Sequence, residues 1–108
     1  MRRGEVVAFD YPFSDGSGSK VRPALVVSSD ALPSRDLILA MISGTASPTS
    51  IAIDPGLEPN SGVKKPCHVR CDKLFSVDQR RVIGSIGRLW PRAMKQTNDA
   101  LRVVLALK

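Results

Sequence analysis

The stretch that decides the fold is PCHVRCD, residues 66–72. We interpret it as a β-strand, in which side chains point alternately to the two faces. Arg70 and Asp72 then share one face, and His68 lies beside them on that face. A cation and a carboxylate side by side on an exposed face can hold a phosphate and move a proton, which is the chemistry that a nuclease needs.

Further extended segments lie on both sides of this strand. They combine apolar, β-branched and aromatic residues and are separated by glycine and proline. We expect strands over Gly4–Tyr11, Val21–Ser28, Leu37–Ile42, Ser50–Ile53, Pro66–Asp72 and Val82–Leu89. The polar run at 14–19 contains two glycines, and we interpret it as a loop that can close over a ligand.

The C-terminal segment has a helical period instead. Pro91 suits the first position of a helix, and apolar residues recur at spacings of three and four from Ala93 to Leu105. We expect an amphipathic helix of about four turns, packed on the sheet or on a partner subunit. Many short strands and one terminal helix predict a mainly β (α+β) fold, a small bent antiparallel sheet or barrel that closes its own edges.

Length and charge limit the class of protein. The chain has 108 residues, which fits a single domain over 1–108. Sixteen lysines and arginines against ten acidic residues give a net charge of +6, which attracts polyanions and makes nucleic acid the first partner to consider. A basic protein that is merely soluble remains the alternative. No apolar leader and no membrane-spanning run are visible, so we expect a cytoplasmic protein without membrane contact.

The two cysteines lie in the same predicted strand, four residues apart. Their Cα atoms are then about 13 Å apart, whereas a disulfide needs less than about 7 Å. We expect Cys67 and Cys71 to be small buried thiols in a reducing compartment. With one histidine and no second cysteine pair, we expect no metal site and no cofactor.

Motifs in several parts of the chain resemble the MazF/PemK toxin family. They keep the family's order and spacing over almost the whole sequence: RGEVV (3–7), GSKVRPALVV (18–27), LAMIS (39–43), VRCDKL (69–74) with Val77-Asp78, and IGRL (86–89). The resemblance implies an SH3-like barrel with a C-terminal helix, and a homodimer. It also implies a metal-independent endoribonuclease that cuts single-stranded RNA, and a cognate antitoxin whose acidic C-terminal tail occupies the RNA groove.

The resemblance also suggests a catalytic site on Arg22, Ser43, Arg70 and Asp72. Asp72 would be the base that activates the RNA 2′-hydroxyl, and Arg70 would stabilise the charge of the phosphorane, since a guanidinium hardly loses protons at neutral pH. Arg22, fixed in extended geometry by Pro23, would grip the scissile phosphate, and Ser43 would hydrogen-bond it. The plain alternatives are an ordinary surface ion pair for Arg70 and Asp72, a solvated charge for Arg22 and a turn residue for Ser43.

Further polar residues are candidates for RNA binding. Family members that use a histidine carry it in the first loop, and the loop at 14–20 has none. Other groups of that loop would contribute instead, and lysines elsewhere would follow the RNA backbone. The candidate RNA-binding residues are Asp15, Lys20, Lys64, Lys65, His68 and Lys73. Phe75 and Trp90 are expected to be core or dimer contacts.

Three functions remain open at this point. The first is a growth-inhibiting endoribonuclease toxin. The alternative is a non-catalytic toxin that binds a protein target such as DNA gyrase, with the C-terminal helix as the contact element; the same fold serves both branches. The third is a nucleic-acid-binding module without turnover.

Overall fold

The computed structural model describes residues 1–12, 15–33 and 35–108. Strands and one helix form where the sequence predicts them, and β5 continues to Asp78 instead of ending at Asp72. The elements are β1 (Glu5–Pro12), β2 (Ser19–Val26), β3 (Asp36–Ser43), β4 (Ser50–Ile53), β5 (Cys67–Asp78), the 3₁₀ helix η1 (Gln79–Arg81), β6 (Val82–Arg88) and α1 (Pro91–Val104). The predicted loop begins at Ser14, which lies outside the described residues, and Ser19 already belongs to β2.

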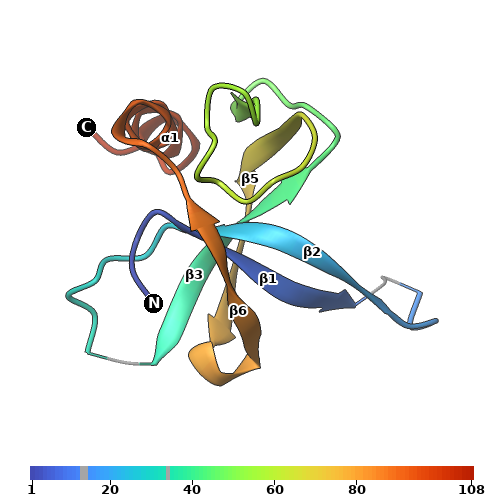
Figure 1. Cartoon of the computed structure of the whole chain (residues 1–108). Helices are drawn as coiled ribbons and strands as arrows, with labels where there is room; N and C mark the ends of the chain where they lie inside the picture. Colours follow the sequence, from blue (N-terminus) through green and yellow to red (C-terminus); the bar gives the residue numbers. More distant parts are fainter. Residues whose placement is uncertain (13–14, 34) are drawn as a thin grey trace.

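All strand pairs are antiparallel and form one sheet in the order β4-β5-β3-β2-β1-β6. Figure 1 shows α1 on one side of this bent sheet and the β1–β2 hairpin extending away on the other. The mainly β (α+β) architecture with a C-terminal helix is therefore confirmed.

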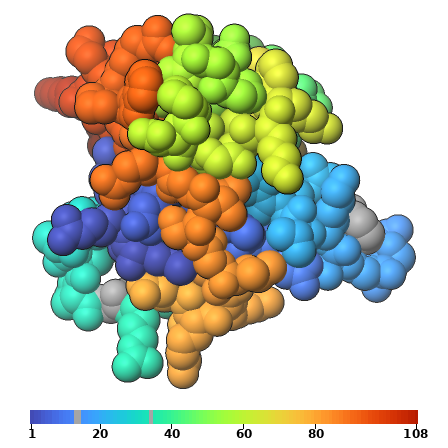
Figure 2. Space-filling model, in the orientation of Figure 1, coloured from blue at the N-terminus to red at the C-terminus, as the bar shows by residue number. Residues whose placement is uncertain are grey.

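From the sequence we expected a sheet that closes its own edges. The structure differs, because strand pairing leaves the sheet open. Within the described ranges, no pairing joins β4 to β6. β4 has only four residues, and the segment after it, residues 54–66, covers the gap. There the N–H of Arg88 donates to the carbonyl of Asn60 at 2.8 Å, and the segment lies directly against β6 in Figure 2.

Two glycines permit this close approach. Gly87 lies so near Asn60 and Ser61 that a Cβ atom would overlap with their backbone. Gly62 has a φ of +79°, which disfavours other residues, and a Cβ there would overlap with the backbone of Ile86. The edge of the sheet is thus closed by packed backbone where a strand pair is missing.

The sheet buries side chains on both of its faces. One cluster includes Leu25, Ile42, Val69 and Leu101 and lies between the sheet and α1. The other includes Val7, Phe9, Val26, Leu39 and Val77, where the bent sheet folds over itself. Phe75 is partly buried and packs against the rings of Phe9 and Tyr11 in this second cluster, with ring centroids 5.4 and 5.1 Å apart. It therefore makes a core contact, one of the two roles expected for it.

The helix begins at Pro91 and turns Ala93, Thr97 and Leu101 towards the sheet. Its amino end is held by Glu58, whose Oε1 accepts the N–H of Trp90 at 2.7 Å. Trp90 itself is 42% exposed. Among the described residues, the helix is too short and too polar to cross a membrane.

Both cysteines are buried and form no disulfide, as predicted. Burial raises the pKa of both thiols, that of Cys71 to about 11. They therefore stay protonated at neutral pH and serve as core residues, not as nucleophiles.

Candidate active site

An irregular point in β5 builds the centre of the candidate site. Along β3, Ala40 pairs with Leu74 and the next residue, Met41, pairs with Arg70. Cys71, Asp72 and Lys73 are thus extra residues on β5 and form a bulge, a feature that re-aims side chains. This bulge was not predictable from the sequence, because apolar and polar residues continue to alternate from Cys67 to Asp72.

Arg70 and Asp72 form a bidentate ion pair across the bulge. Nε of Arg70 donates to Oδ1 of Asp72 at 2.9 Å, and Nη2 donates to Oδ2 at 2.9 Å. The Arg70 side chain is only 12% exposed, and that of Asp72 is 36% exposed. The expected shared face of these two residues is therefore present, with the carboxylate on the more open side.

The loop between β3 and β4 makes one hydrogen bond to each member of this ion pair. The carbonyl of Thr45 accepts Nη1 of Arg70 at 3.3 Å, and the hydroxyl of Ser47 donates to Oδ1 of Asp72 at 3.1 Å. Arg70 thereby uses three of the five N–H groups of a guanidinium. The other two, one on each Nη, have no acceptor among the described residues and are available to a phosphate.

The ion pair favours the charged form of both side chains, because it shifts the pKa of each away from neutrality. Hydrogen bonds from Arg70 hold the pKa of Asp72 well below its usual range, and the hydroxyl of Ser47 adds to this. The same bonds raise the pKa of Arg70. A guanidinium with a raised pKa does not act as a proton donor, so the geometry favours a role for Arg70 in charge stabilisation.

Register places two more predicted residues on the same face of the sheet. Directly opposed residues of antiparallel strands point to the same side, and Ser43 is opposed to His68 while Met41 is opposed to Arg70. Ala24 of β2 is opposed to Met41, and Arg22, two residues before Ala24 on the same strand, points to the same side as Ala24. Arg22, Ser43, His68 and Arg70 therefore line one face.

Arg22 and Ser43 differ in how free their polar groups are. Arg22 is half-buried and forms no hydrogen bond or ion pair with any residue in the described ranges, which leaves its guanidinium available to a ligand. The hydroxyl of Ser43 is engaged in the turn: it donates to the carbonyl of Thr45 and accepts the N–H of Thr45, both at 3.2 Å. Ser43 thus also has the turn role that was its plain alternative.

The candidate RNA-binding lysines lie on, or directly before, strands that contribute to this face. Lys20 is exposed on β2, two residues before Arg22, and Lys73 is exposed in the bulge. Lys64 and Lys65 are exposed just before β5 begins, at the end of the strand that carries His68. The carboxylate of Asp15 accepts the N–H of Ser17 at 2.9 Å, and its hydrogen bonds with Ser17 lower its pKa.

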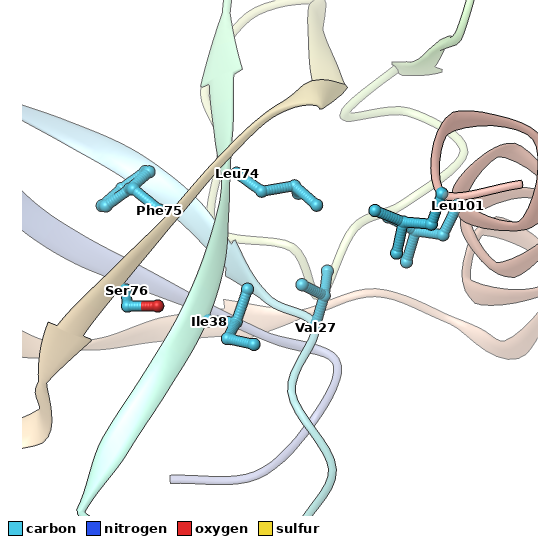
Figure 3. Close-up of a pocket in the computed structure, with 7 residues that line it drawn as sticks. Val27, Ile38, Leu74, Phe75, Ser76 and Leu101 are labelled. Carbon is cyan, nitrogen blue, oxygen red and sulfur yellow. The ribbon is translucent and has the colours of Figure 1, made fainter.

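Three hollows lie beside α1, and His68 lines one of them, of about 300 Å³, whereas Arg22, Ser43, Arg70 and Asp72 line none of the three. A cavity of about 330 Å³ lies between the sheet and the end of α1, lined by Val27, Ile38, Leu74 and Leu101 among others. In Figure 3 the side chains of Leu74 and Leu101 face each other across it, and Phe75 points to the other side of β5. The candidate site is therefore an open face of the sheet, as a long polymer requires, and not a pocket for a small molecule.

Sequence reasoning missed Thr45 and Ser47. Both lie in a run rich in serine and threonine, residues 43–50, which carries a signal for turns but none for contact with β5.

Within the described part of the chain, no three histidine, cysteine, aspartate or glutamate side chains gather closely enough to hold a metal ion.

Comparison with known proteins identifies the family. The family model of the PemK-like, MazF-like toxins of type II toxin-antitoxin systems matches residues 2–105. The chain belongs to this family. The resemblance that the motifs had indicated is thereby confirmed.

Solved structures share the fold at low identity. A mycobacterial endoribonuclease in complex with its cognate antitoxin has a TM-score of 0.79 at 23% identity, covering 100% of this chain and 97% of that one. MazF in a MazE–MazF complex from Deinococcus radiodurans has a TM-score of 0.78 at 19% identity, covering 100% and 98%. The toxin MazF-mt6 of Mycobacterium tuberculosis has a TM-score of 0.73 at 18% identity, covering 94% and 98%.

Proposed function

We propose that this toxin is a sequence-selective endoribonuclease that cleaves single-stranded RNA without a metal and so inhibits translation and growth. The observation that supports this best is the Arg70–Asp72 pair, held by the β3–β4 loop on the sheet face that also carries Arg22 and Ser43. Family membership and the endoribonuclease relatives agree with the proposal.

The chemistry uses the substrate's own nucleophile. The 2′-hydroxyl attacks the adjacent phosphorus, the bond from phosphorus to the 5′-oxygen breaks, and the departing 5′-oxygen takes a proton from water. A 2′,3′-cyclic phosphate and a 5′-hydroxyl result. The free N–H groups of Arg70 and the guanidinium of Arg22 bind the phosphate oxygens and stabilise the charge that develops on them.

Asp72 takes the proton of the 2′-hydroxyl in this proposal. Its low pKa makes it a weak base while both oxygens are bound to Arg70. Oδ1 accepts both Nε of Arg70 and the hydroxyl of Ser47, whereas Oδ2 accepts Nη2 of Arg70. Oδ2 therefore takes the proton while the ion pair stays intact.

The RNA backbone follows the basic residues that surround the site. Lys20, Lys64, Lys65 and Lys73 are all exposed and contribute charge without base specificity. His68, opposed to Ser43, contacts a nucleotide next to the scissile phosphate.

The test is cleavage of a sequence-diverse RNA by the purified protein in excess EDTA. We expect short products that end in a 2′,3′-cyclic phosphate and begin with a 5′-hydroxyl. Absence of cleavage by the wild-type protein, or products with a 5′-phosphate, would contradict the proposal.

Protein partners are also proposed: a second copy of the chain and an antitoxin with an acidic C-terminal tail. The neighbours solved with an antitoxin agree with the second partner. An acidic tail complements the basic residues around Arg22 and Arg70 and would compete with RNA for them. We expect size-exclusion chromatography with light scattering to give the mass of a dimer.

A second candidate function has one observation in its favour. The last turn of α1 and the residues after it expose Val103, Leu105 and Leu107, by 71%, 50% and 60%. Such an apolar strip suits contact with a protein target such as DNA gyrase. In that case the double variant Arg70→Ala/Asp72→Ala keeps its toxicity in cells. Under the endoribonuclease proposal it loses it.

A further inference from the structure

Ser47 contacts the candidate site but takes no part in the bond changes of the proposed reaction. Its hydroxyl contacts Oδ1 of Asp72, the oxygen that also accepts Nε of Arg70. Ser47 comes from a different strand connection, 25 residues before Asp72. It is thus a tertiary contact to the ion pair and is not part of the local geometry of β5.

The backbone of Ser47 is itself fixed. Its N–H donates to the hydroxyl of Ser50 at 2.9 Å, and that hydroxyl donates back to the carbonyl of Ser47 at 2.9 Å. Ser50 is opposed to Arg70 in the pairing of β4 with β5. The turn 47–50 is therefore anchored at the residue opposite Arg70, and the position of the Ser47 hydroxyl is fixed.

The ion pair needs such support. A bidentate pair that is partly exposed exchanges its hydrogen bonds with water, and a carboxylate on a bulge is free to rotate about its last bond. Two contacts from the β3–β4 loop hold the carboxylate plane of Asp72 against the guanidinium plane of Arg70. Ser47 contacts Oδ1 of Asp72, and Thr45 contacts Nη1 of Arg70. The orientation of the guanidinium, and of its remaining N–H groups, is thereby fixed.

We propose that Ser47 is a positioning residue, whose hydroxyl locks the Asp72 carboxylate against Arg70 and so orients the guanidinium towards the scissile phosphate. This inference rests on the proposed endoribonuclease function. It assigns to the β3–β4 loop a part in the chemical step, while substrate affinity comes from Arg22 and the lysines.

The test compares three variants of the full-length protein: Ser47→Ala, Ser47→Thr as a rescue, and Ser76→Ala as a control. Ser76 is an exposed hydroxyl residue of the same strand β5. We expect Ser47→Ala to lower kcat about tenfold, which corresponds to about 1.4 kcal/mol, with KM little changed. Ser47→Thr restores most of kcat, and Ser76→Ala behaves as wild type.

A second readout does not depend on RNA. Nuclear magnetic resonance follows the exchange of the Arg70 Nε hydrogen with solvent, which is slow while that hydrogen is bonded to Asp72. We expect faster exchange in Ser47→Ala and wild-type exchange in Ser47→Thr and Ser76→Ala. A loop that merely stabilises the fold would not change this signal.

The failures of the two proposals are distinguishable. A wild-type protein that cleaves no RNA contradicts the endoribonuclease function. A wild-type protein that cleaves RNA, together with a Ser47→Ala variant of unchanged kcat or unchanged Arg70 exchange, leaves that function standing and overturns the role of Ser47.

Discussion

Two arginine–aspartate pairs lie on β5 and its end, with the same spacing of two residues and the same bidentate geometry. Arg70 donates to both oxygens of Asp72 at 2.9 Å. Arg80 donates to both oxygens of Asp78 at 3.1 and 2.8 Å. In each pair the arginine lowers the pKa of the aspartate.

Their surroundings differ. The side chain of Arg70 is 12% exposed, whereas that of Arg80 is 74% exposed. Asp78 accepts the backbone N–H of Arg80 and so caps η1, while Asp72 accepts the hydroxyl of Ser47 from a distant loop. Spacing and bidentate contact therefore make an ion pair, whereas burial and tertiary anchoring make a candidate site.

The largest expected difference between the pairs concerns the two guanidinium groups. We expect Arg70→Lys to lower the rate of RNA cleavage about 100-fold, because lysine is a point charge that cannot bind Asp72 twice and still bind phosphate. Arg80→Lys should leave the rate unchanged. Single-turnover cleavage assays measure both, with circular dichroism as the control for folding. Equal rates for the two variants would remove the distinction.

A smaller effect concerns the basic residues around the site. We expect Lys64→Gln/Lys65→Gln to weaken RNA binding about tenfold at physiological salt and to reduce the salt slope by about 1.4, since each lysine releases counterions from single-stranded RNA. Lys95→Gln/Lys108→Gln removes the same charge from the helix end of the molecule and is the matched control. Fluorescence anisotropy at several salt concentrations gives both slopes, and identical slopes would mean that only net charge matters.

The smallest expected effect concerns the stability of the fold in acid. It tests whether Asp78 acts as the cap of η1 and not as part of the candidate site. The folded pKa of Asp78 is about 2, below its unfolded value, so its contribution to stability is complete above about pH 4. That contribution is lost as the pH falls through about 2. We expect Asp78→Asn to unfold at lower urea than wild type at pH 7, and the difference to vanish near pH 2. A difference that persists there would assign it to something other than this carboxylate.

Much of this fold was predictable because its elements are local. The strands around Leu25 and Leu39 are short apolar runs between turn residues, and the helix from Pro91 has a clear period. The missing pairing of β4 with β6 was not predictable, because it depends on how the 54–66 segment packs on Gly87. A lone sequence does not show such backbone packing.

The candidate site was predictable in part. Motifs led to Arg22, Ser43, Arg70 and Asp72, and register then placed the first three on one face. The contacts of Thr45 and Ser47 were missed, because the bulge at 71–73 and the loop over it are tertiary features. Without the family motif, spacing alone does not separate the pair at 70 and 72 from the pair at 78 and 80.

The central claim is that the Arg70–Asp72 pair, and not the equivalent pair at the end of β5, cleaves RNA. The most direct measurement is the cleavage rate of Asp72→Asn and Asp78→Asn on one RNA in EDTA, with folding checked for both. We expect Asp72→Asn to be slower than wild type by about 100-fold or more, and Asp78→Asn to match wild type. Wild-type cleavage by a folded Asp72→Asn protein would contradict the account.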